Sequence, residues 1–288
     1  MDEHEWLAAR FEENRPRLRS VSYRMLGSLS DAEDAVQQAW LRLSRAHTSA
    51  VENLEAWLTT VVARVCLDML RSRESRREEP LESIAGRSGG ANAEQEVLLA
   101  DSVGLALLVI LNTLDPAERL AFVLHDMFGM SFDEIAPIVE RSTAAARQLA
   151  SRARRRIQGK TEVRDADVAR QREVVDAFLA AARAGDFQRL LALLDPDIVH
   201  RSDRPPTETR GAAAVAKNAA RGAARAAQGG AGVAQPALVD GAVGVIVAPR
   251  GRLQLVVRFT IQGGKITEIE TISNPERLAQ LDLAVLGE

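Results

Sequence analysis

Apolar residues recur at intervals of three and four from about Glu5 to Arg77, and this period predicts amphipathic helices. "LRSVSYRMLGS" carries one apolar stripe, and "NLEAWLTTVVARVCLDMLRSRESRR" carries a longer one that becomes basic at its end. Between them, Ser30 and Glu33 of "SDAEDAVQQAWLRL" have the spacing of a capping box, which predicts a helix start at Ser30. The stripes predict a shared core: Leu18, Val21, Met25, Ala32, Val36, Ala39, Leu43, Leu58, Val61, Val62, Val65 and Met69.

The segment from Glu78 to Gln95, rich in glycine and polar residues, predicts a flexible linker. Helical patterns then resume up to Ile157. In "LDPAERLAFVLHDMFG", Asp115 is a predicted N-cap, Pro116 occupies the first helical position, and Gly129 ends a single helix. "SFDEIAPIV" starts with a second capping box, Ser131 and Glu134.

A last helix, "TAAARQLASRARRRI", follows a short turn and is expected to be capped by Ser142. Its predicted inward stripe consists mostly of alanine: Ala146, Leu149, Ala150, Ala153 and Ile157. Its predicted outward stripe is Arg147, Ser151, Arg154 and Arg155. Two short helices joined by a tight turn, the second basic and narrow, predict a helix-turn-helix.

From about Val168 the pattern changes from helical to mixed. Two amphipathic helices precede short alternating stretches that include "DIVHRS", "AVGVIVAP", "RLQLVVRFTIQ" and "KITEIETIS". Turns at "DG", "PRG" and "GG" predict antiparallel hairpins. An alanine-rich helix interrupts the series, so the third block is expected to be an α+β layer.

Composition and charge restrict the classes of function. The chain has 288 residues and a formal net charge of -3, yet residues 147–156 contain five arginines and no acid. Cys66 is the single cysteine and is expected to be a small buried hydrophobe, and the four scattered histidines offer no zinc-ligand spacing. No signal peptide or membrane span is expected, so we predict a cytoplasmic protein without a cofactor or metal and without a membrane partner.

The arginine-rich helix has four possible roles: a solvated helix face, a nucleic-acid-reading helix, a membrane-surface helix or a calmodulin-type target. A membrane helix needs bulky apolar anchors, and the alanine-rich stripe has none. The neighbouring helix and tight turn favour DNA reading.

The blocks "SDAEDAVQQAWLRL", "EAWLTTVVARVCLDMLRSR", "LDPAERLAFVLHDMFGMSFDEIA" and "RSTAAARQLASRARR" together resemble bacterial extracytoplasmic-function (ECF) sigma factors. The third block resembles the SnoaL-like (NTF2-like) extension of the SigJ-type subgroup, and "NPERL" resembles its terminal signature. The resemblance implies a multidomain chain: two all-α domains followed by an α+β cone. The expected ranges are region 2 at 1–78, a linker at 79–95, region 4 at 96–158, a linker at 159–167 and the SnoaL-like domain at 168–288.

The resemblance also implies partners and site residues. Core RNA polymerase, through its β′ clamp helices and β flap, and promoter DNA are the expected partners, and a separate anti-sigma factor is not expected to be required. The expected polymerase-binding residues are Asp31, Asp34, Gln37 and Trp40. Those for the -10 element are Arg64, Asp68, Arg71, Ser72, Arg73 and Arg76, and those for the -35 element are Thr143, Arg147, Gln148, Ser151, Arg152, Arg154 and Arg155. The expected regulatory residues are Asp203, Asn274, Pro275, Arg277 and Leu278.

The chain departs from the family pattern at several positions. Pro137 lies inside the first helix of the helix-turn-helix, and Glu140 stands in the turn where glycine is usual. "REEPLES" replaces the subgroup's WLPEP motif, and "SDRPP" replaces its SDGGG motif. A left-handed Glu140 would cost about 1–2 kcal/mol.

SnoaL-like folds also include isomerases and cyclases, so an enzyme or a small-ligand module is the alternative for the third block. "DPDIVHRSD" offers Asp197, His200 and Asp203. On a strand the two aspartates share one face and His200 points to the other, so no acid–base dyad is expected within this motif. We therefore expect no enzymatic activity, and leave a small apolar ligand in the cone as a possibility.

Overall fold

The computed structural model describes residues 3–45, 53–77, 104–159, 165–228, 234–248 and 253–286. They fall into two compact units: unit 1 contains Met1–Val103 and Leu111–Arg154, and unit 2 contains Gly104–Ile110 and Arg155–Glu288. The predicted linker at 79–95 and most of the one at 159–167 lie outside the described residues, as does the side chain of Arg76. No helix within the described ranges is long and apolar enough to cross a membrane.

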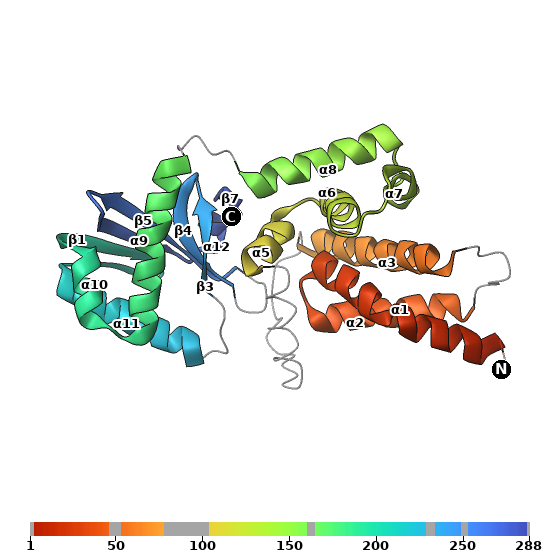
Figure 1. Ribbon diagram of the computed structural model, residues 1–288, viewed down its shortest axis with the longest axis horizontal. Helices are drawn as coiled ribbons and strands as arrows, with labels where there is room; N and C mark the ends of the chain where they lie inside the picture. The colour runs from red at the N-terminus through yellow and green to blue at the C-terminus, as the bar shows by residue number, and fades with distance from the viewer. Residues whose placement is uncertain are drawn as a thin grey trace. The chain divides into compact units, whose positions relative to one another are not determined.

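Three helices open unit 1: α1 (Glu3–Leu26), α2 (Leu29–Leu43) and α3 (Leu54–Arg77) (Figure 1). Their predicted stripes form a common core, in which all the predicted residues but the half-buried Met69 are buried. The predicted start of the second helix at Ser30 is wrong. The N-cap is Ser28, two residues before the predicted one, and its hydroxyl accepts from the Asp31 amide. Ser28 takes this role because it has the extended backbone of an N-cap directly after the turn at Gly27.

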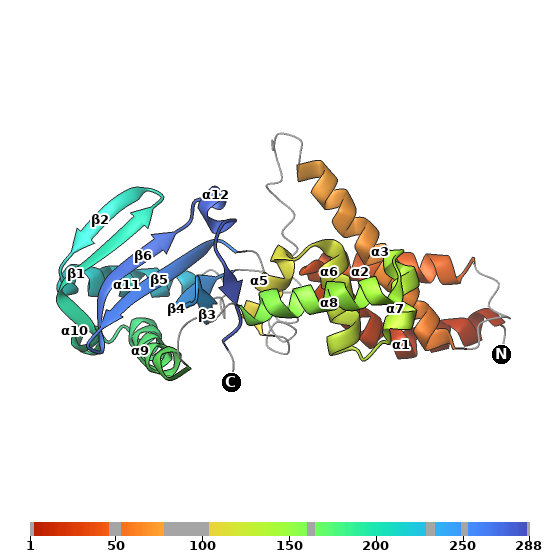
Figure 2. The same cartoon turned by 90° about the horizontal axis from the view of Figure 1, so that it is seen from above.

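The helix-turn-helix block contains α5 (Leu105–Thr113), α6 (Pro116–Phe122), a π-helical turn η2 (Val123–Met127), α7 (Phe132–Val139) and α8 (Thr143–Gln158) (Figure 2). The caps predicted at Asp115, Ser131 and Ser142 are confirmed by their side-chain hydrogen bonds. The single helix predicted from Pro116 is instead α6 followed by η2. The π-turn forms because Met130 N donates to Leu124 O and His125 Nδ1 bonds Met130 O, which widens the last turn.

Most of unit 2 is a sheet with helices on one face (Figures 1 and 2). Its helices are α9 (Asp165–Ala184), α10 (Phe187–Leu193), α11 (Ala212–Gln228) and α12 (Pro275–Leu278). Its strands are β1 (Leu194–Asp203), β2 (Pro206–Arg210), β3 (Ala234–Val239), β4 (Ala242–Val247), β5 (Leu255–Gln262), β6 (Lys265–Ile272) and β7 (Leu283–Ala284). The order is β2-β1-β6-β5-β4-β3-β7.

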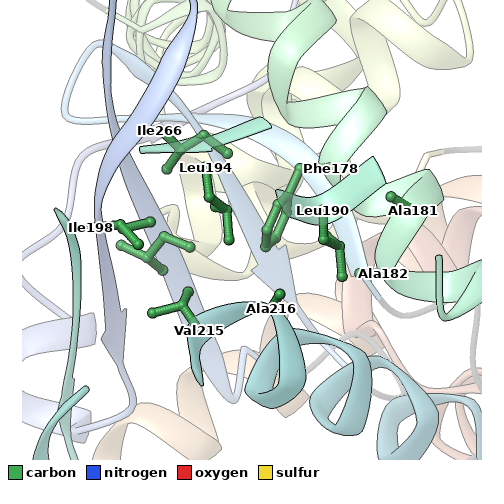
Figure 3. Packing of buried hydrophobic residues seen from close by; sticks show 10 residues of the cluster. Phe178, Ala181, Ala182, Leu190, Leu194, Ile198, Val215, Ala216 and Ile266 are labelled. Atoms are coloured by element: carbon green, nitrogen blue, oxygen red, sulfur yellow. The ribbon is translucent and has the colours of Figure 1, made fainter. Parts of the chain in front are cut away.

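The hydrophobic core of unit 2 lies between α9, α10, α11 and the sheet (Figure 3). Phe178 packs edge-on against Phe259 at a centroid distance of 5.5 Å, and Val215 and Ala216 bring α11 close to the same cluster. Pairing is antiparallel except between β1 and β6, which are parallel. The predicted fold class, two all-α segments followed by an α+β cone, is confirmed.

Candidate functional site

The turn between α7 and α8 sets the entry of the arginine-rich helix. Glu140 ends α7 in the left-handed region, with φ 57° and ψ 45°. The Ser142 hydroxyl accepts from the Ala145 amide at 3.2 Å, and Thr143 Oγ1 donates to Asp133 Oδ1 at 2.9 Å. In the capping box of α7, hydrogen bonds from the Ser131 hydroxyl and backbone hold the pKa of Glu134 below its ordinary value. Both helices of the motif therefore start at satisfied caps.

Helix α8 buries the predicted alanine-rich face and exposes basic residues on the other side. Ala146, Ala150 and Ala153 are fully buried, with Leu149 and Ile157 nearly so. Arg147, Gln148, Arg152 and Arg155 are exposed, whereas Thr143, Ser151 and Arg154 are half-buried. Small side chains on the inner face let α8 lie close to its neighbours, while long basic side chains cover its other side.

Three arginines of α8 contact side chains from earlier elements. Arg152 Nε donates to Glu118 Oε1 at 2.6 Å, and Arg154 Nε donates to Asp126 Oδ1 at 2.6 Å. The Arg147 guanidinium lies 5.5 Å from the ring centroid of Phe132, and that ring stacks on His125 at 3.9 Å. The sequence pattern did not predict these contacts.

The residues expected at the -10 element lie along the second half of α3. Arg64, Asp68 and Arg71 are exposed, and Ser72 and Arg73 are half-buried. Arg64 Nη2 donates to the Pro137 carbonyl at 3.5 Å, and Asp68 lies 3.9 Å from Arg42. Part of this basic row therefore contacts the helix-turn-helix within unit 1.

The residues expected to contact polymerase occupy α2. Asp34 and Gln37 are exposed, and Leu41 next to them exposes 45% of its surface. Trp40 is half-buried, with its ring centroid 5.1 Å from that of Phe11. Asp31 pairs with Arg73 at 2.7 Å, so one expected polymerase residue and one expected -10 residue bind each other. Asp34, Gln37 and Leu41 form the accessible part of this surface.

Arg119 is a buried residue that the sequence analysis missed. Its guanidinium donates twice to the Arg24 carbonyl, at 3.0 and 2.8 Å, and once to Asn112 Oδ1 at 2.6 Å. Burial lowers the pKa of Arg119, and in the same region burial raises the pKa of the Cys66 thiol to about 12. The end of α1 is thus hydrogen-bonded to α6, and Cys66 is a buried thiol as expected.

The residues expected to be regulatory form one cluster in unit 2. Asp203 accepts hydrogen bonds from Ser273 N at 2.8 Å, from the Ser273 hydroxyl at 3.1 Å and from Asn274 N at 3.3 Å, and it pairs with Arg277 at 3.3 Å. Burial raises the pKa of Asp203, but these hydrogen bonds and the Arg277 charge outweigh it, so the pKa lies below its ordinary value. Asn274 caps α12 and Arg277 also binds Glu270 at 2.6 Å. Pro275 and Leu278 complete that helical turn.

The candidate acid–base residues of β1 are separated, as expected. His200 Nε2 lies 3.0 Å from Thr271 Oγ1, and burial lowers the pKa of His200. Asp203 binds the cluster around α12, and Asp197 is exposed. Elsewhere on the sheet a hollow of about 190 Å³ is lined by residues that include Gly244, Arg258 and Glu270, which is smaller than common small-molecule sites of roughly 300 Å³ or more.

The end of α8 and the last strand of the chain meet within unit 2. Val285 N donates to the Ile157 carbonyl at 2.9 Å. Gly159 follows with φ 69°, and a Cβ at this position would lie 2.5 Å from that of Ala284. The basic helix therefore ends against β7, which itself pairs with β3.

Similarity to known proteins agrees with this architecture. Sigma-70 region 2 matches residues 10–76, and Sigma-70, region 4 matches residues 104–157. These matches cover the helical region 2 and the helix-turn-helix region 4, and the chain belongs to the ECF RNA polymerase sigma factor family.

Two relatives come from Mycobacterium tuberculosis. The probable ECF RNA polymerase sigma factor SigI is 36% identical over 98% of both chains, and the ECF RNA polymerase sigma factor SigJ is 36% identical over 93% of this chain and 91% of its own. The crystal structure of SigJ aligns with 94% of this chain and 98% of its own at 32% identity, with a TM-score of 0.47.

Proposed function

We propose that this sigma factor docks on core RNA polymerase through α2, reads the -10 element with the second half of α3 and reads the -35 element with α8. Residues 1–78, 96–158 and 168–288 then serve as region 2, region 4 and a regulatory domain. The single observation that supports the DNA role best is α8 itself, which buries alanines and exposes Arg147, Gln148 and Arg152. Arginine forks bind phosphates and guanine edges, and glutamine pairs with adenine.

Run-off transcription with core polymerase on genomic fragments tests this function. We expect discrete transcripts with the wild-type chain. Asp34→Arg places a like charge beside a basic partner surface, so its affinity for core polymerase should fall at least about ten-fold, while DNA binding by the free protein stays unchanged. Asp34→Asn is the control and should lose less. Wild-type core affinity in Asp34→Arg would place the docking surface elsewhere.

We further propose that the α+β domain regulates the chain in place of a separate anti-sigma factor. The supporting observation is that the last turn of α8 belongs to the same compact unit as the α+β domain, where Val285 N donates to the Ile157 carbonyl. A tethered domain has an effective concentration in roughly the millimolar range, so even a weak contact stays mostly formed. The turn of Asn274, Pro275, Arg277 and Leu278, held by Asp203, is the proposed regulatory element near the carboxyl end.

Val285→Pro tests this regulation because it removes the amide donor without touching the β3–β7 ladder, which pairs Leu283 and Ala284. We expect Val285→Pro and deletion of residues 161–288 to raise DNA binding by the free protein. Val285→Ala keeps the donor and should behave like the wild type. If the deletion and Val285→Pro both bind DNA and transcribe as the wild type does, the domain is a passive module.

The alternative is that the α+β domain binds a small molecule or acts as an isomerase or cyclase. Catalysis by the β1 motif requires an acid–base pair, and His200 bonds Thr271 while Asp203 binds the cluster around α12. These contacts favour a non-catalytic domain. A small ligand that changes DNA binding by the full chain would support a signalling module instead.

A further inference from the structure

Three arginines of α8 are supported by side chains from other elements of the same block. Arg152 contacts Glu118 of α6, Arg154 contacts Asp126 of η2, and Arg147 stacks on Phe132 of α7. Each supporting side chain comes from a different element of the helix-turn-helix block. A long arginine side chain normally loses rotamer freedom when it binds, and a support that fixes it beforehand reduces that loss.

Glu118 and Asp126 each bind their arginine on its Nε side. In each pair the Nε–H donates, and no hydrogen bond from the terminal nitrogens is present within the described part of the chain. An arginine has five N–H donors in a fixed plane, so the edge formed by the two terminal nitrogens stays available for a bidentate contact. That edge fits a phosphate or the O6 and N7 atoms of guanine.

The supports are themselves fixed. The Glu118 side chain is only 11% exposed and lies in the first turn of α6, whose start is fixed by Asp115 and Pro116. The Asp126 side chain is 23% exposed and lies in η2, which Gly129 N and Met130 N close by donating to His125 O and Leu124 O. The π-helical turn, absent from the sequence prediction, is what holds Asp126 beside Arg154.

We propose that Glu118 and Asp126 are positioning residues for promoter recognition, which hold Arg152 and Arg154 so that their terminal nitrogens face the DNA. The inference rests on the proposed role of α8 as the -35 reader. Charge alone gives the opposite expectation. A carboxylate beside a polyanion repels it, so its removal should tighten binding if Glu118 and Asp126 do nothing but carry charge.

The test measures holoenzyme binding to a labelled duplex spanning a start site mapped by run-off transcription with the wild type. Glu118→Ala and Asp126→Ala should each weaken binding about five-fold, since one rotamer-rich side chain must then be immobilised on binding. Glu118→Gln keeps an oxygen acceptor for Arg152 and should recover part of the loss. The salt slope should remain at its wild-type value because every arginine keeps its charge.

Two controls separate positioning from general effects. Glu140→Gln removes a carboxylate from the same motif at an exposed position and should bind as tightly as the wild type or slightly more tightly. In an Arg152→Ala background, Glu118→Ala should have no further effect on binding, because its arginine is gone. Thermal unfolding of each variant reports whether the fold persists. If Glu118→Ala does not fold, Asp126→Ala tests the proposal instead, because the Asp126 side chain is more exposed.

The possible results separate a failure of the positioning role from a failure of the proposed promoter-reading function. If the wild-type holoenzyme does not bind the duplex, the promoter-reading role fails and the inference fails with it. If the wild type binds and both alanine variants bind equally or more tightly, only the positioning role is overturned. A five-fold loss that persists in the Arg152→Ala background would mean that Glu118 acts on the fold rather than on Arg152.

Discussion

At the residue scale, single positions carry backbone strain or buried charge that neighbouring residues must balance. Glu140 is a non-glycine residue in the left-handed region, at the turn where the family pattern has glycine. The place of Glu140 in the turn predicted a left-handed backbone, and the positive φ of 57° confirms it. Ser142, which caps α8, follows two residues later, so the strain lies next to the arginine-rich helix.

We expect Glu140→Gly to raise the free energy of unfolding by about 1 kcal/mol. Glycine avoids the left-handed penalty of roughly 1–2 kcal/mol. It also makes the unfolded chain more flexible, which offsets part of this gain in stability. Urea unfolding followed by circular dichroism measures the difference. Glu140→Gln keeps a Cβ and should stay within about 0.5 kcal/mol of the wild type. An unchanged midpoint in Glu140→Gly would mean that the turn relaxes without strain.

At the element scale, strand β1 and helix α12 are joined through one carboxylate. Asp203 at the end of β1 receives the amides of Ser273 and Asn274, and Asn274 in turn caps α12. Arg277 of α12 closes the cluster by pairing with Asp203 and Glu270. Segments about seventy residues apart in the chain thus depend on one ionised side chain.

Acidification should weaken the contacts that join β1 to α12 through Asp203. The pKa of Asp203 is lowered in the folded protein, so its contribution to stability is complete above the unfolded value of about 4 and is lost as the pH falls through the folded pKa. Asp203→Asn should destabilise the protein by about 1.5–3 kcal/mol at pH 7. The gap from the wild type should shrink as the pH falls from about 5 to below 3.

The matched control for the acid experiment is Asp197→Asn on the same strand, where the aspartate is exposed. This variant should follow the wild-type stability curve at every pH. A gap between Asp203→Asn and the wild type that stays constant down to pH 2 would contradict the assignment of this titration to Asp203.

At the scale of the whole molecule, unit 1 combines segments from both sides of residues 78–103. Arg119 is a buried link between them, since it binds the Arg24 carbonyl near the end of α1. All three of its hydrogen bonds within the described residues end on neutral oxygens. None of these partners is a carboxylate. Removing the Arg119 guanidinium would leave these buried oxygen acceptors without donors, which lowers the free energy of unfolding.

Arg119→Ala should therefore lower the free energy of unfolding of unit 1 by about 3 kcal/mol, from unpaired acceptors and lost packing. Hydrogen exchange of the α1 and α6 amides should rise together, because one residue holds both elements. Arg141→Ala, at an exposed arginine of the same block, should change stability by less than about 0.5 kcal/mol. Faster exchange confined to α6 would show that Arg119 does not link the two segments.

The sequence by itself determined the local features of this protein. The caps at Asp115, Ser131 and Ser142, the alanine-rich face of α8 and the hairpin turns at "DG" and "GG" follow from spacing and residue type, because such features involve residues only a few positions apart. The turn predicted at "PRG" lies outside the described residues. The family resemblance rests on such local motifs, and it led to the correct order of helical and mixed blocks.

Only the tertiary structure decided which distant groups meet. The parallel pairing of β1 with β6, the pairing of Asp31 with Arg73 and the burial of Arg119 against Arg24 join segments that no periodic pattern connects. The same holds for Glu118 and Asp126, which stand 34 and 28 residues before their arginines. Side-chain pairing depends on where a folded chain brings two groups within about 3 Å, and that distance is set by the packing of all the elements between them.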